Sequence, residues 1–281
     1  MNYLDAMNYG SKILRSNKIK NFTLDSEILL ANVLNTSREE ILVNLEKRIN
    51  KKNFICYKRK ILRRKKNEPI AYIFKEKEFW KYKFKVDKNV LIPRPETEQI
   101  IEETLKLIKK NTSKRVLDVG TGSGCIILSI VKERPKCHAT AIDLSKKAIN
   151  VAIINAKMHH LANKIKFINI NIDKFKSYKY DFIVSNPPYI STYDLKRLER
   201  DVRLFEPNLA LNAGIDGLTE IKKLIFKSNN LLKKNGKLIF EIGRNQVVKV
   251  VQLLKNNGFY VNKVCKDMQS YPRVIITTKT F

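Results

Sequence analysis

Five consecutive residues, Gly120 to Gly124, hold three of the nine glycines of the chain, in the sequence Gly-Thr-Gly-Ser-Gly. They follow the apolar run Val116–Val119, which predicts a strand, and they precede a helical pattern. Glycine lets the backbone turn sharply and lets a ligand approach without a Cβ in the way. Because doubly wound folds bind ligands at the carboxyl edge of the sheet, we expect a ligand site at this turn.

Two carboxylates indicate which ligand this turn could bind. Asp118, at the end of the first predicted strand, would repel a pyrophosphate and attract the cationic methionyl end of S-adenosylmethionine. Asp143 ends the second strand, nineteen residues after Gly124, where it can accept hydrogen bonds from ribose hydroxyls. The G-x-G-x-G spacing differs from that of dinucleotide folds, and no Gly-Lys-Ser/Thr follows, which excludes a P-loop. The alternative interpretation is a tight turn in which Asp143 caps a helix.

A second motif, Asn186-Pro187-Pro188-Tyr189, follows another apolar strand at the same edge of the sheet. Its two prolines fix the backbone and remove two amide donors, so the loop is rich in acceptors. An asparagine oxygen and a proline carbonyl can accept both N–H bonds of a planar amino group, while a tyrosine ring packs on its flat face. The motif favours a substrate with a conjugated NH2, either an amide or an aromatic amine. The alternative interpretation is a plain proline-rich turn.

Strand and helix patterns alternate through the second half of the chain and would position both motifs. The expected strands are 115–119, 139–142, 165–170, 181–185, 237–241, 260–264 and 274–278. The expected helices between them are 125–133, 146–158, 218–232 and 246–256. This alternation predicts an α/β fold with a doubly wound, mostly parallel sheet. The last two strands are joined by too few residues for a helix, so we expect an antiparallel C-terminal hairpin strand at one edge.

The chain divides into three expected segments. Residues 1–68 form a small helical domain, in which Ser37-Arg38-Glu39-Glu40 has the form of a capping box. Residues 69–113 form a β-hairpin and a linker helix, because Trp80, Tyr82, Phe84 and Val86 alternate with polar residues before a helical pattern at 97–110. Residues 114–281 form the domain that carries both motifs.

The composition bounds the class of protein. The chain has 281 residues, 43% of them hydrophobic, so it can bury a sizeable core. Its formal net charge of +29 predicts affinity for polyanions. An AT-rich genome would also supply the lysines, so the charge has two explanations. Eleven of the twenty residues at 47–66 are basic, which fits either a solvated helix face or a phosphate-contacting one.

Neither a metal centre nor a membrane segment is expected. The four cysteines show no paired spacing, and the histidines have no Asp or Cys partners at ligand spacing. No apolar stretch reaches the roughly 18 residues of a spanning helix, and the N-terminus lacks the pattern of a signal peptide. We therefore expect a cytoplasmic protein.

The two motifs together resemble class I, S-adenosylmethionine-dependent amino-methyltransferases. Two further stretches, IPRPETE at 92–98 and EPNLAL at 206–211, and the helical N-terminal domain narrow the resemblance. Their combination is similar to the protein-(glutamine-N5) methyltransferases, which modify the glutamine of the Gly-Gly-Gln loop in class I peptide chain release factors. The resemblance implies a class I methyltransferase sheet, methylation of a release factor in support of translation termination, and an N-terminal domain that recognises this substrate. We expect a monomer, with nucleic-acid contact possible but not required.

The resemblance also assigns roles to residues. After Asp173, either Lys174 or Phe175 should cover the adenine of the cofactor, and Lys174 is taken as the contact. The expected cofactor contacts are Asp118, Gly120, Thr121, Gly122, Ser123, Gly124, Asp143, Lys174 and Asn186. The expected substrate contacts are Asn186, Pro187, Pro188 and Tyr189, of which Asn186, Pro187 and Tyr189 are the catalytic residues. Tyr189 is expected to shape the pocket, and no general base is expected.

Alternatives remain open from the sequence. The same pocket would suit an adenine-N6 methyltransferase that acts on a flipped base of RNA or DNA. A non-catalytic protein that binds RNA or ribosomes through residues 47–66 is a third hypothesis. Arg94 and Glu96 would either pair with each other as a hinge lock or line the pocket mouth. The role of Arg273, near the last strand, stays open, and one hypothesis is that it reaches the active-site face.

Overall fold

In the computed structural model, which describes residues 1–280, the chain divides into two units. The first contains residues 1–75 and also the short segment 199–205, and the second contains the rest of the described chain. No helix among the described residues is long and apolar enough to cross a membrane. Within the same residues, no group of three or more His, Cys, Asp or Glu side chains lies close enough together to hold a metal ion.

The first unit is helical. Its helices are α1 (Tyr3–Ser16), α2 (Phe22–Leu34), α3 (Arg38–Val43), α4 (Lys51–Lys65), α5 (Ile70–Phe74) and α9 (Arg200–Phe205). Side-chain oxygens cap several of these helices, and Ser37 accepts from the amide of Glu40 at the start of α3 as its sequence predicts. The basic segment forms α4, which buries Tyr57 and Ile61 and exposes most of its lysines.

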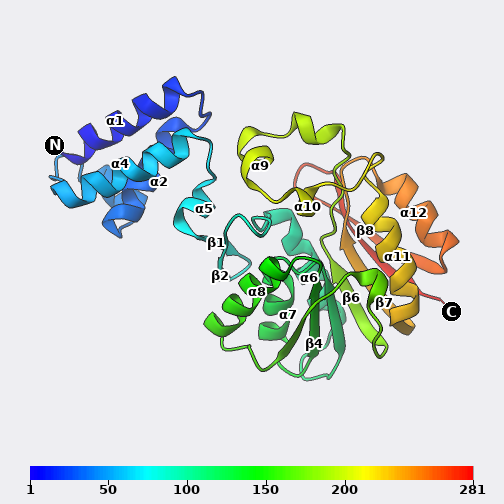
Figure 1. Ribbon diagram of the computed structural model, residues 1–281. Coiled ribbons are helices and arrows are strands. Elements are labelled where there is room, and N and C mark those ends of the chain that lie inside the picture. The colour runs from blue at the N-terminus through cyan, green and yellow to red at the C-terminus, as the bar shows by residue number, and fades with distance from the viewer. Residues whose placement is uncertain (281) are drawn as a thin grey trace. The chain divides into compact units, whose positions relative to one another are not determined.

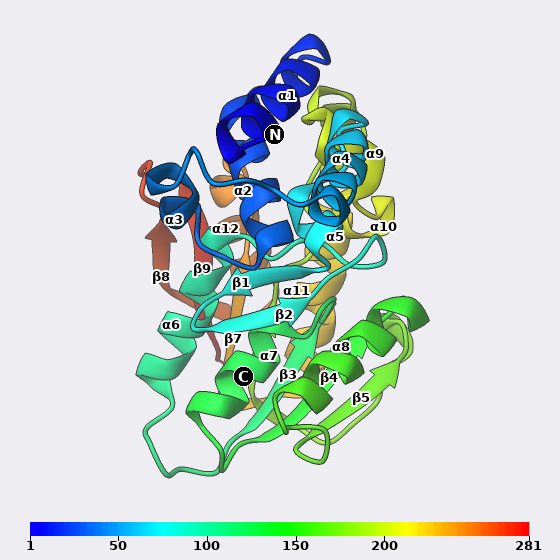
Figure 2. The same cartoon turned by 90° about the vertical axis from the view of Figure 1, so that its left-hand side faces the viewer.

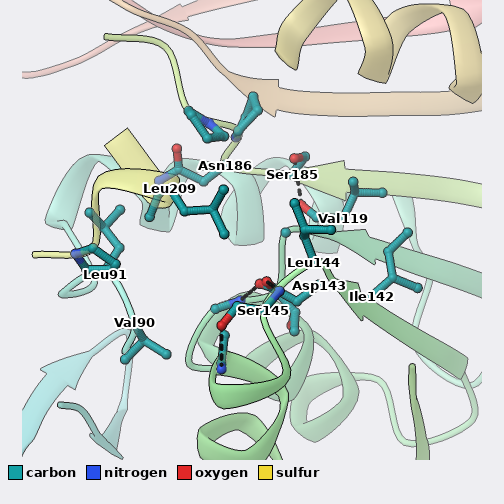
Figure 3. A pocket seen from close by; sticks show the side chains of 18 of the residues that line it. Val90, Leu91, Val119, Ile142, Asp143, Leu144, Ser145, Ser185, Asn186 and Leu209 are labelled. Atoms are coloured by element: carbon teal, nitrogen blue, oxygen red, sulfur yellow. Dashed lines mark hydrogen bonds between the residues drawn. The ribbon is translucent and has the colours of Figure 1, made fainter. Parts of the chain in front are cut away.

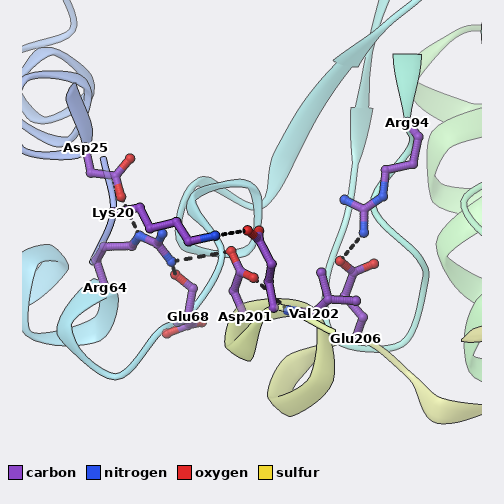
Figure 4. A network of polar contacts seen from close by, with 9 residues as sticks. Lys20, Asp25, Arg64, Glu68, Arg94, Asp201, Val202 and Glu206 are labelled. Atoms are coloured by element: carbon purple, nitrogen blue, oxygen red, sulfur yellow. Dashed lines mark hydrogen bonds and ion pairs between the residues drawn. The ribbon is translucent and has the colours of Figure 1, made fainter. Parts of the chain in front are cut away.

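Ion pairs join α9 to the other helices of this unit (Figure 4). Arg64 of α4 lies 2.7 Å from Asp25 of α2 and 3.8 Å from Asp201 of α9. Lys20 lies 2.6 Å from Glu199, although both of these side chains are largely exposed. The half-buried Arg64 therefore holds α9 more firmly than the exposed pair does, since water screens exposed charges.

The second unit is built on a seven-stranded sheet (Figure 1). Its strands are β3 (Arg115–Val119), β4 (His138–Asp143), β5 (Ile165–Asn169), β6 (Tyr180–Ser185), β7 (Leu232–Glu241), β8 (Phe259–Lys266) and β9 (Pro272–Lys279). The strand order is β5-β4-β3-β6-β7-β9-β8, and only β9 runs antiparallel to its neighbours. The prediction of a mostly parallel sheet with an antiparallel C-terminal strand is therefore confirmed.

Successive residues of the strands face opposite layers of helices. Val116 of β3 packs in the layer of α6 (Glu98–Leu107), α7 (Cys125–Glu133) and α8 (Lys146–Met158), whereas Leu117 packs in the layer of α11 (Thr219–Leu231) and α12 (Val247–Asn256). The two layers cover the two faces of the sheet in Figure 1. A strand buried on both faces is apolar at most of its positions, which explains the nearly continuous apolar runs of the sequence.

A two-stranded hairpin, β1 (Glu76–Phe79) and β2 (Tyr82–Lys85), packs on α8 (Figure 2). The alternating pattern predicts that Trp80 lies inside a strand, and this prediction is wrong. Trp80 has a φ of +57° and occupies the turn between β1 and β2. The chain cannot reverse direction unless a residue leaves the extended region of φ and ψ. The alternation of apolar and polar residues continues through Trp80 and Lys81, so it does not reveal the turn.

Asn155 of α8 connects the hairpin to the glycine-rich turn. Its fully buried side chain accepts from the Lys85 amide at 2.7 Å and donates to the carbonyls of Lys85 at 2.9 Å and of Ser123 at 2.8 Å. All the hydrogen-bonding atoms of this amide are therefore directed at backbone groups. Asn155 fixes the turn on which the candidate site depends.

Replacing Asn155 by Ala should lower the free energy of unfolding by about 3 kcal/mol, because it leaves buried backbone groups without partners. The matched control is Asn150→Ala, since Asn150 lies on the same helix and is exposed. Chemical denaturation of both variants measures the difference. Equal stability of the two variants would contradict the role given to Asn155.

Candidate functional site

A cavity of about 370 Å³ lies at the carboxyl ends of β3, β4, β5 and β6. Residues 119–123, 143–145, 170–172 and 185–188 line it. Further lining residues include 88–91, Pro93, Thr97, Pro207, Leu209, Ala210 and Asn212. Figure 3 shows Asp143 and Asn186 at this cavity among apolar side chains such as Val90, Leu144 and Leu209. Parallel strands bring their carboxyl ends to one edge, so segments far apart in the sequence meet here.

The three glycines of the turn have two different functions. Gly120 and Gly122 line the cavity with φ of +71° and +55°, and a Cβ on Gly120 would meet no protein atom within 4 Å. Gly124 does not line the cavity. A Cβ there would lie 2.9 Å from Cδ1 of Leu128 and 3.2 Å from Cβ of Ala152, so Gly124 allows α7 and α8 to pack closely. Its predicted contact with the cofactor stays a prediction.

Asp118 lies in β3, two residues before the turn; it is fully buried and does not line the cavity itself. The hydroxyl of Thr121, which does line the cavity, donates to Oδ2 of Asp118 at 2.6 Å. Oδ1 of Asp118 has no hydrogen-bond partner. Burial raises the pKa of Asp118 to about 7, against the hydrogen bond from Thr121, which lowers it. A cation in the cavity would stabilise the ionised form, and this buried, incompletely paired carboxylate therefore fits the methionyl end of S-adenosylmethionine.

Asp143 ends β4 and lines the cavity. Its oxygens accept from the amides of Gly122 at 2.9 Å and of Ser145 at 2.8 Å. Burial raises the pKa of Asp143, and these two hydrogen bonds oppose the shift. The N-cap of α8 is Ser145, which accepts from the amide of Ala148. Asp143 therefore orders the turn rather than capping the helix, and each carboxylate oxygen keeps a lone pair for a ribose hydroxyl.

The Asn-Pro-Pro-Tyr loop begins a buried chain of hydrogen bonds. Nδ2 of Asn186 donates to Oγ1 of Thr97 at 2.9 Å, and this hydroxyl donates to Oε2 of Glu241 at 2.6 Å. The hydroxyl of Tyr189 donates to Oε1 of Glu241 at 3.0 Å. Asn186, Pro187 and Pro188 line the cavity. Tyr189 follows directly in the loop and is not among the residues that line the cavity, and its hydroxyl is directed to Glu241.

Lys174 and Phe175 are not among the residues that line the cavity. Lys174 ends a 3₁₀ turn (Ile172–Lys174), and Phe175 is buried in the core on the α11 side of the sheet. Ile170, Asn171 and Ile172 line the cavity in their place. Their position directly after β5 (Ile165–Asn169) could have identified them from the sequence. The first residues beyond a parallel strand lie at the carboxyl edge of the sheet, where the cavity is.

Two loops beside the cavity are held by one carboxylate. Glu206 accepts from the guanidinium of Arg94 and, at 3.1 Å, from the amide of Ile92 (Figure 4). Arg94 therefore pairs with Glu206 and not with Glu96. Arg273 donates to Asp267 at 2.8 Å. Burial raises the pKa of Glu241, and the positive charge of Arg273 opposes that shift. The sequence analysis did not identify Thr97 or Glu241, although Thr97 stands in the IPRPETE stretch and Glu241 ends an apolar strand.

Comparison with protein families gives two matches along the chain. Residues 5–74 match the PrmC N-terminal domain, and residues 100–201 match the methyltransferase small domain. The release factor glutamine methyltransferase of Clostridium acetobutylicum is 36% identical over 282 residues, which is 99% of each chain. That of Fusobacterium nucleatum is 36% identical over 98% of this chain and 78% of its own length. The bifunctional methyltransferase of Rickettsia bellii is 35% identical over 96% of this chain, which spans 53% of that longer protein.

Solved structures share the fold. The catalytic domain of hMettl16, in complex with MAT2A 3'UTR hairpin 6, has a TM-score of 0.57 and 20% identity over 70% of this chain and 75% of its own. The ribosomal protein L11 methylase of Lactobacillus delbrueckii subsp. bulgaricus has a TM-score of 0.51 and 19% identity over 67% of this chain and 81% of its own. A methyltransferase domain of this fold implies S-adenosylmethionine as the methyl donor.

The raised pKa of Asp118 makes binding of this cationic cofactor depend on pH. Since the protonated carboxyl must lose its proton to attract the cation, affinity should rise with pH, becoming about tenfold stronger at pH 8 than at pH 6. Calorimetry in two buffers of different ionisation enthalpy should show proton release near pH 7. The control Asp118→Asn should abolish the release. Unchanged wild-type affinity between pH 6 and 8 would contradict the prediction.

Proposed function

This chain belongs to the family of the release factor glutamine methyltransferases, and we propose that it methylates the glutamine of the Gly-Gly-Gln motif in class I peptide chain release factors. The acceptor atom is the side-chain amide nitrogen, N5, and S-adenosylmethionine is the methyl donor. The two relatives named release factor glutamine methyltransferase support this proposal, since the similarity extends over nearly the whole chain. The methylation would take place in the cytoplasm, where release factors act.

One observation carries the proposal: the amide nitrogen of Asn186 is bound by Thr97, while the residue lines the cavity. The side-chain oxygen of Asn186 is therefore left to accept an N–H bond, and the carbonyl of Pro187 offers a second acceptor. Two acceptors suit a planar NH2 group. A substrate hydroxyl or thiol, which has a single proton, would leave one of them without a partner.

The protein's contribution to the reaction is orientation and electrostatics. The sulfonium of the cofactor supplies an activated methyl group, but an amide nitrogen attacks poorly because it shares its lone pair with the carbonyl. Acceptors at Asn186 and Pro187 hold the NH2 group and stabilise the positive charge that grows on it. Apolar side chains such as Ile142 and Leu209 exclude water from the cavity. The methylated amide then loses its proton to water, so no protein base is needed.

The other residues receive proposed roles in binding. Asp143 accepts the ribose hydroxyls of the cofactor, the backbone of Gly120 and Gly122 admits it without steric conflict, and Asp118 supplies negative charge. Residues 1–68 recognise the body of the release factor. The match of residues 5–74 to the PrmC N-terminal domain covers nearly all of this segment and supports a function for it beyond stability.

The second candidate is an adenine-N6 methyltransferase acting on RNA. The exposed lysines and arginines of α4 favour it, because such a face can contact phosphates. Labelled S-adenosylmethionine, incubated with a purified release factor and separately with total RNA, distinguishes the two. The proposal expects label in the release factor, and label in RNA alone would favour the adenine enzyme.

Asn186→Ala should lower kcat by at least about a hundredfold and leave cofactor affinity nearly unchanged, because it removes an acceptor that orients the reacting nitrogen. Single-turnover methyl transfer and calorimetry measure the two effects. The exposed Asn150→Ala is the matched control. Activity within tenfold of wild type would remove Asn186 from the catalytic site.

Asp143→Ala should show the opposite pattern. Because the ribose hydroxyls lose an ionised acceptor worth ~1.5–3 kcal/mol, cofactor affinity should fall by about tenfold or more. Loss of the hydrogen bond to Gly122 adds disorder to the turn. Calorimetric titration that gives wild-type affinity would show that Asp143 lies outside the cofactor site.

A further inference from the structure

The proposed function requires that Asn186 present its oxygen to the substrate, yet the two ends of an asparagine amide have nearly the same shape. An amide turned by 180° would present two donors to a substrate NH2, which is itself a donor. Such an enzyme would repel the group that it must hold. Some feature of the protein has to fix the direction of this amide.

The chain from Asn186 through Thr97 to Glu241 is such a feature. Thr97 is 2% exposed and Glu241 is 1% exposed, so water does not compete for their hydrogen bonds. The hydroxyl of Thr97 has a single proton. When the carboxylate of Glu241 accepts that proton, the hydroxyl oxygen can only accept a further hydrogen bond, and the NH2 end of Asn186 must face it.

We propose that Thr97 and Glu241 are positioning residues that fix the direction of the Asn186 amide and so direct its oxygen to the substrate nitrogen. This inference rests on the proposed function and adds to it the means by which the acceptor is oriented. Neither residue needs to touch the reacting atoms. The direction of one hydroxyl proton decides whether Asn186 is an acceptor or a donor in the cavity.

Tyr189 completes this arrangement. Its hydroxyl donates to the second oxygen of Glu241, so both carboxylate oxygens accept hydrogen bonds. These two bonds hold the carboxylate in one orientation. The charge of Arg273 also favours the ionised form, while burial and the nearby Glu96 disfavour it. The tyrosine of the Asn-Pro-Pro-Tyr motif thus acts on the asparagine through Glu241 rather than on the substrate.

A protonated Glu241 would reverse the arrangement. Its O–H would donate to Thr97, which frees the Thr97 proton to turn toward Asn186 and lets the amide flip. Burial raises the pKa of Glu241, so kcat at saturating cofactor should fall as the pH is lowered through this raised value. Glu241→Gln, which has no such titration, should be slow at every pH and lack this acid limb.

The test compares Thr97→Val, which keeps the shape and loses the hydroxyl, with Thr97→Ser, which keeps the hydroxyl. Thr97→Val should lower kcat about a hundredfold with cofactor affinity unchanged, and Thr97→Ser should retain most of the rate. The matched control is Thr104→Val, because Thr104 is also fully buried and its hydroxyl bonds only to the carbonyl of Ile100. Wild-type kcat in Thr97→Val, or an equal loss in Thr97→Ser, would overturn the proposal.

A second readout needs neither turnover nor a variant. In the unaltered protein with ¹⁵N-labelled asparagine, the side-chain NH2 of Asn186 should exchange slowly with solvent. Its resonances should change with the same pH midpoint as the carboxyl carbon of Glu241. Fast exchange, or no response to that titration, would overturn the proposal. A protein that passes this test but transfers no methyl group to a release factor would refute the proposed function and leave the positioning role standing.

Discussion

A carboxylate buried at the end of a sheet strand must be paired, and the pairing of Glu241 organises the acceptor side of the site. Thr97, before α6, and Tyr189, after β6, each donate to one of its oxygens. These residues lie more than fifty positions from Glu241 in the sequence. Because leaving a buried charge without partners costs several kcal/mol, the fold is constrained to bring the three segments together. Asn186 takes its direction from that constraint.

The cofactor side of the site depends on two other carboxylates, Asp118 and Asp143. Asp143 holds the glycine-rich turn through the amide of Gly122, and the buried Asp118 at the end of β3 accepts from Thr121 of that turn. Asn155 fastens the same turn from α8 through the carbonyl of Ser123. A methyl donor and a methyl acceptor can therefore meet across one cavity, since β3, β4 and β6 end at the same edge of the sheet. The positions of the reacting groups follow from sheet topology and a few buried polar contacts.

The sequence predicted what depends on local pattern. The mostly parallel sheet follows from apolar runs alternating with helices, and the cavity positions of Gly120, Asp143 and Asn186 follow from their places at strand ends. Predictions that required a side-chain direction did worse. The hydroxyl of Tyr189 is directed to Glu241, 52 positions away in the sequence, and Lys174 does not line the cavity. Thr97 and Glu241 could not be identified from the sequence, because their proposed role depends on hydrogen bonds between segments far apart in the chain.

The central claim is that the cavity methylates an amide nitrogen of a protein, and locating the transferred methyl group tests it most directly. A purified class I release factor is incubated with this protein and with S-adenosylmethionine that carries a deuterated methyl group, and tandem mass spectrometry then locates the label. The account predicts one labelled methyl group on the side-chain amide nitrogen of the Gly-Gly-Gln glutamine. Label on another residue of the release factor would contradict this claim. So would an unlabelled release factor together with label on adenine N6 of RNA present in the same reaction.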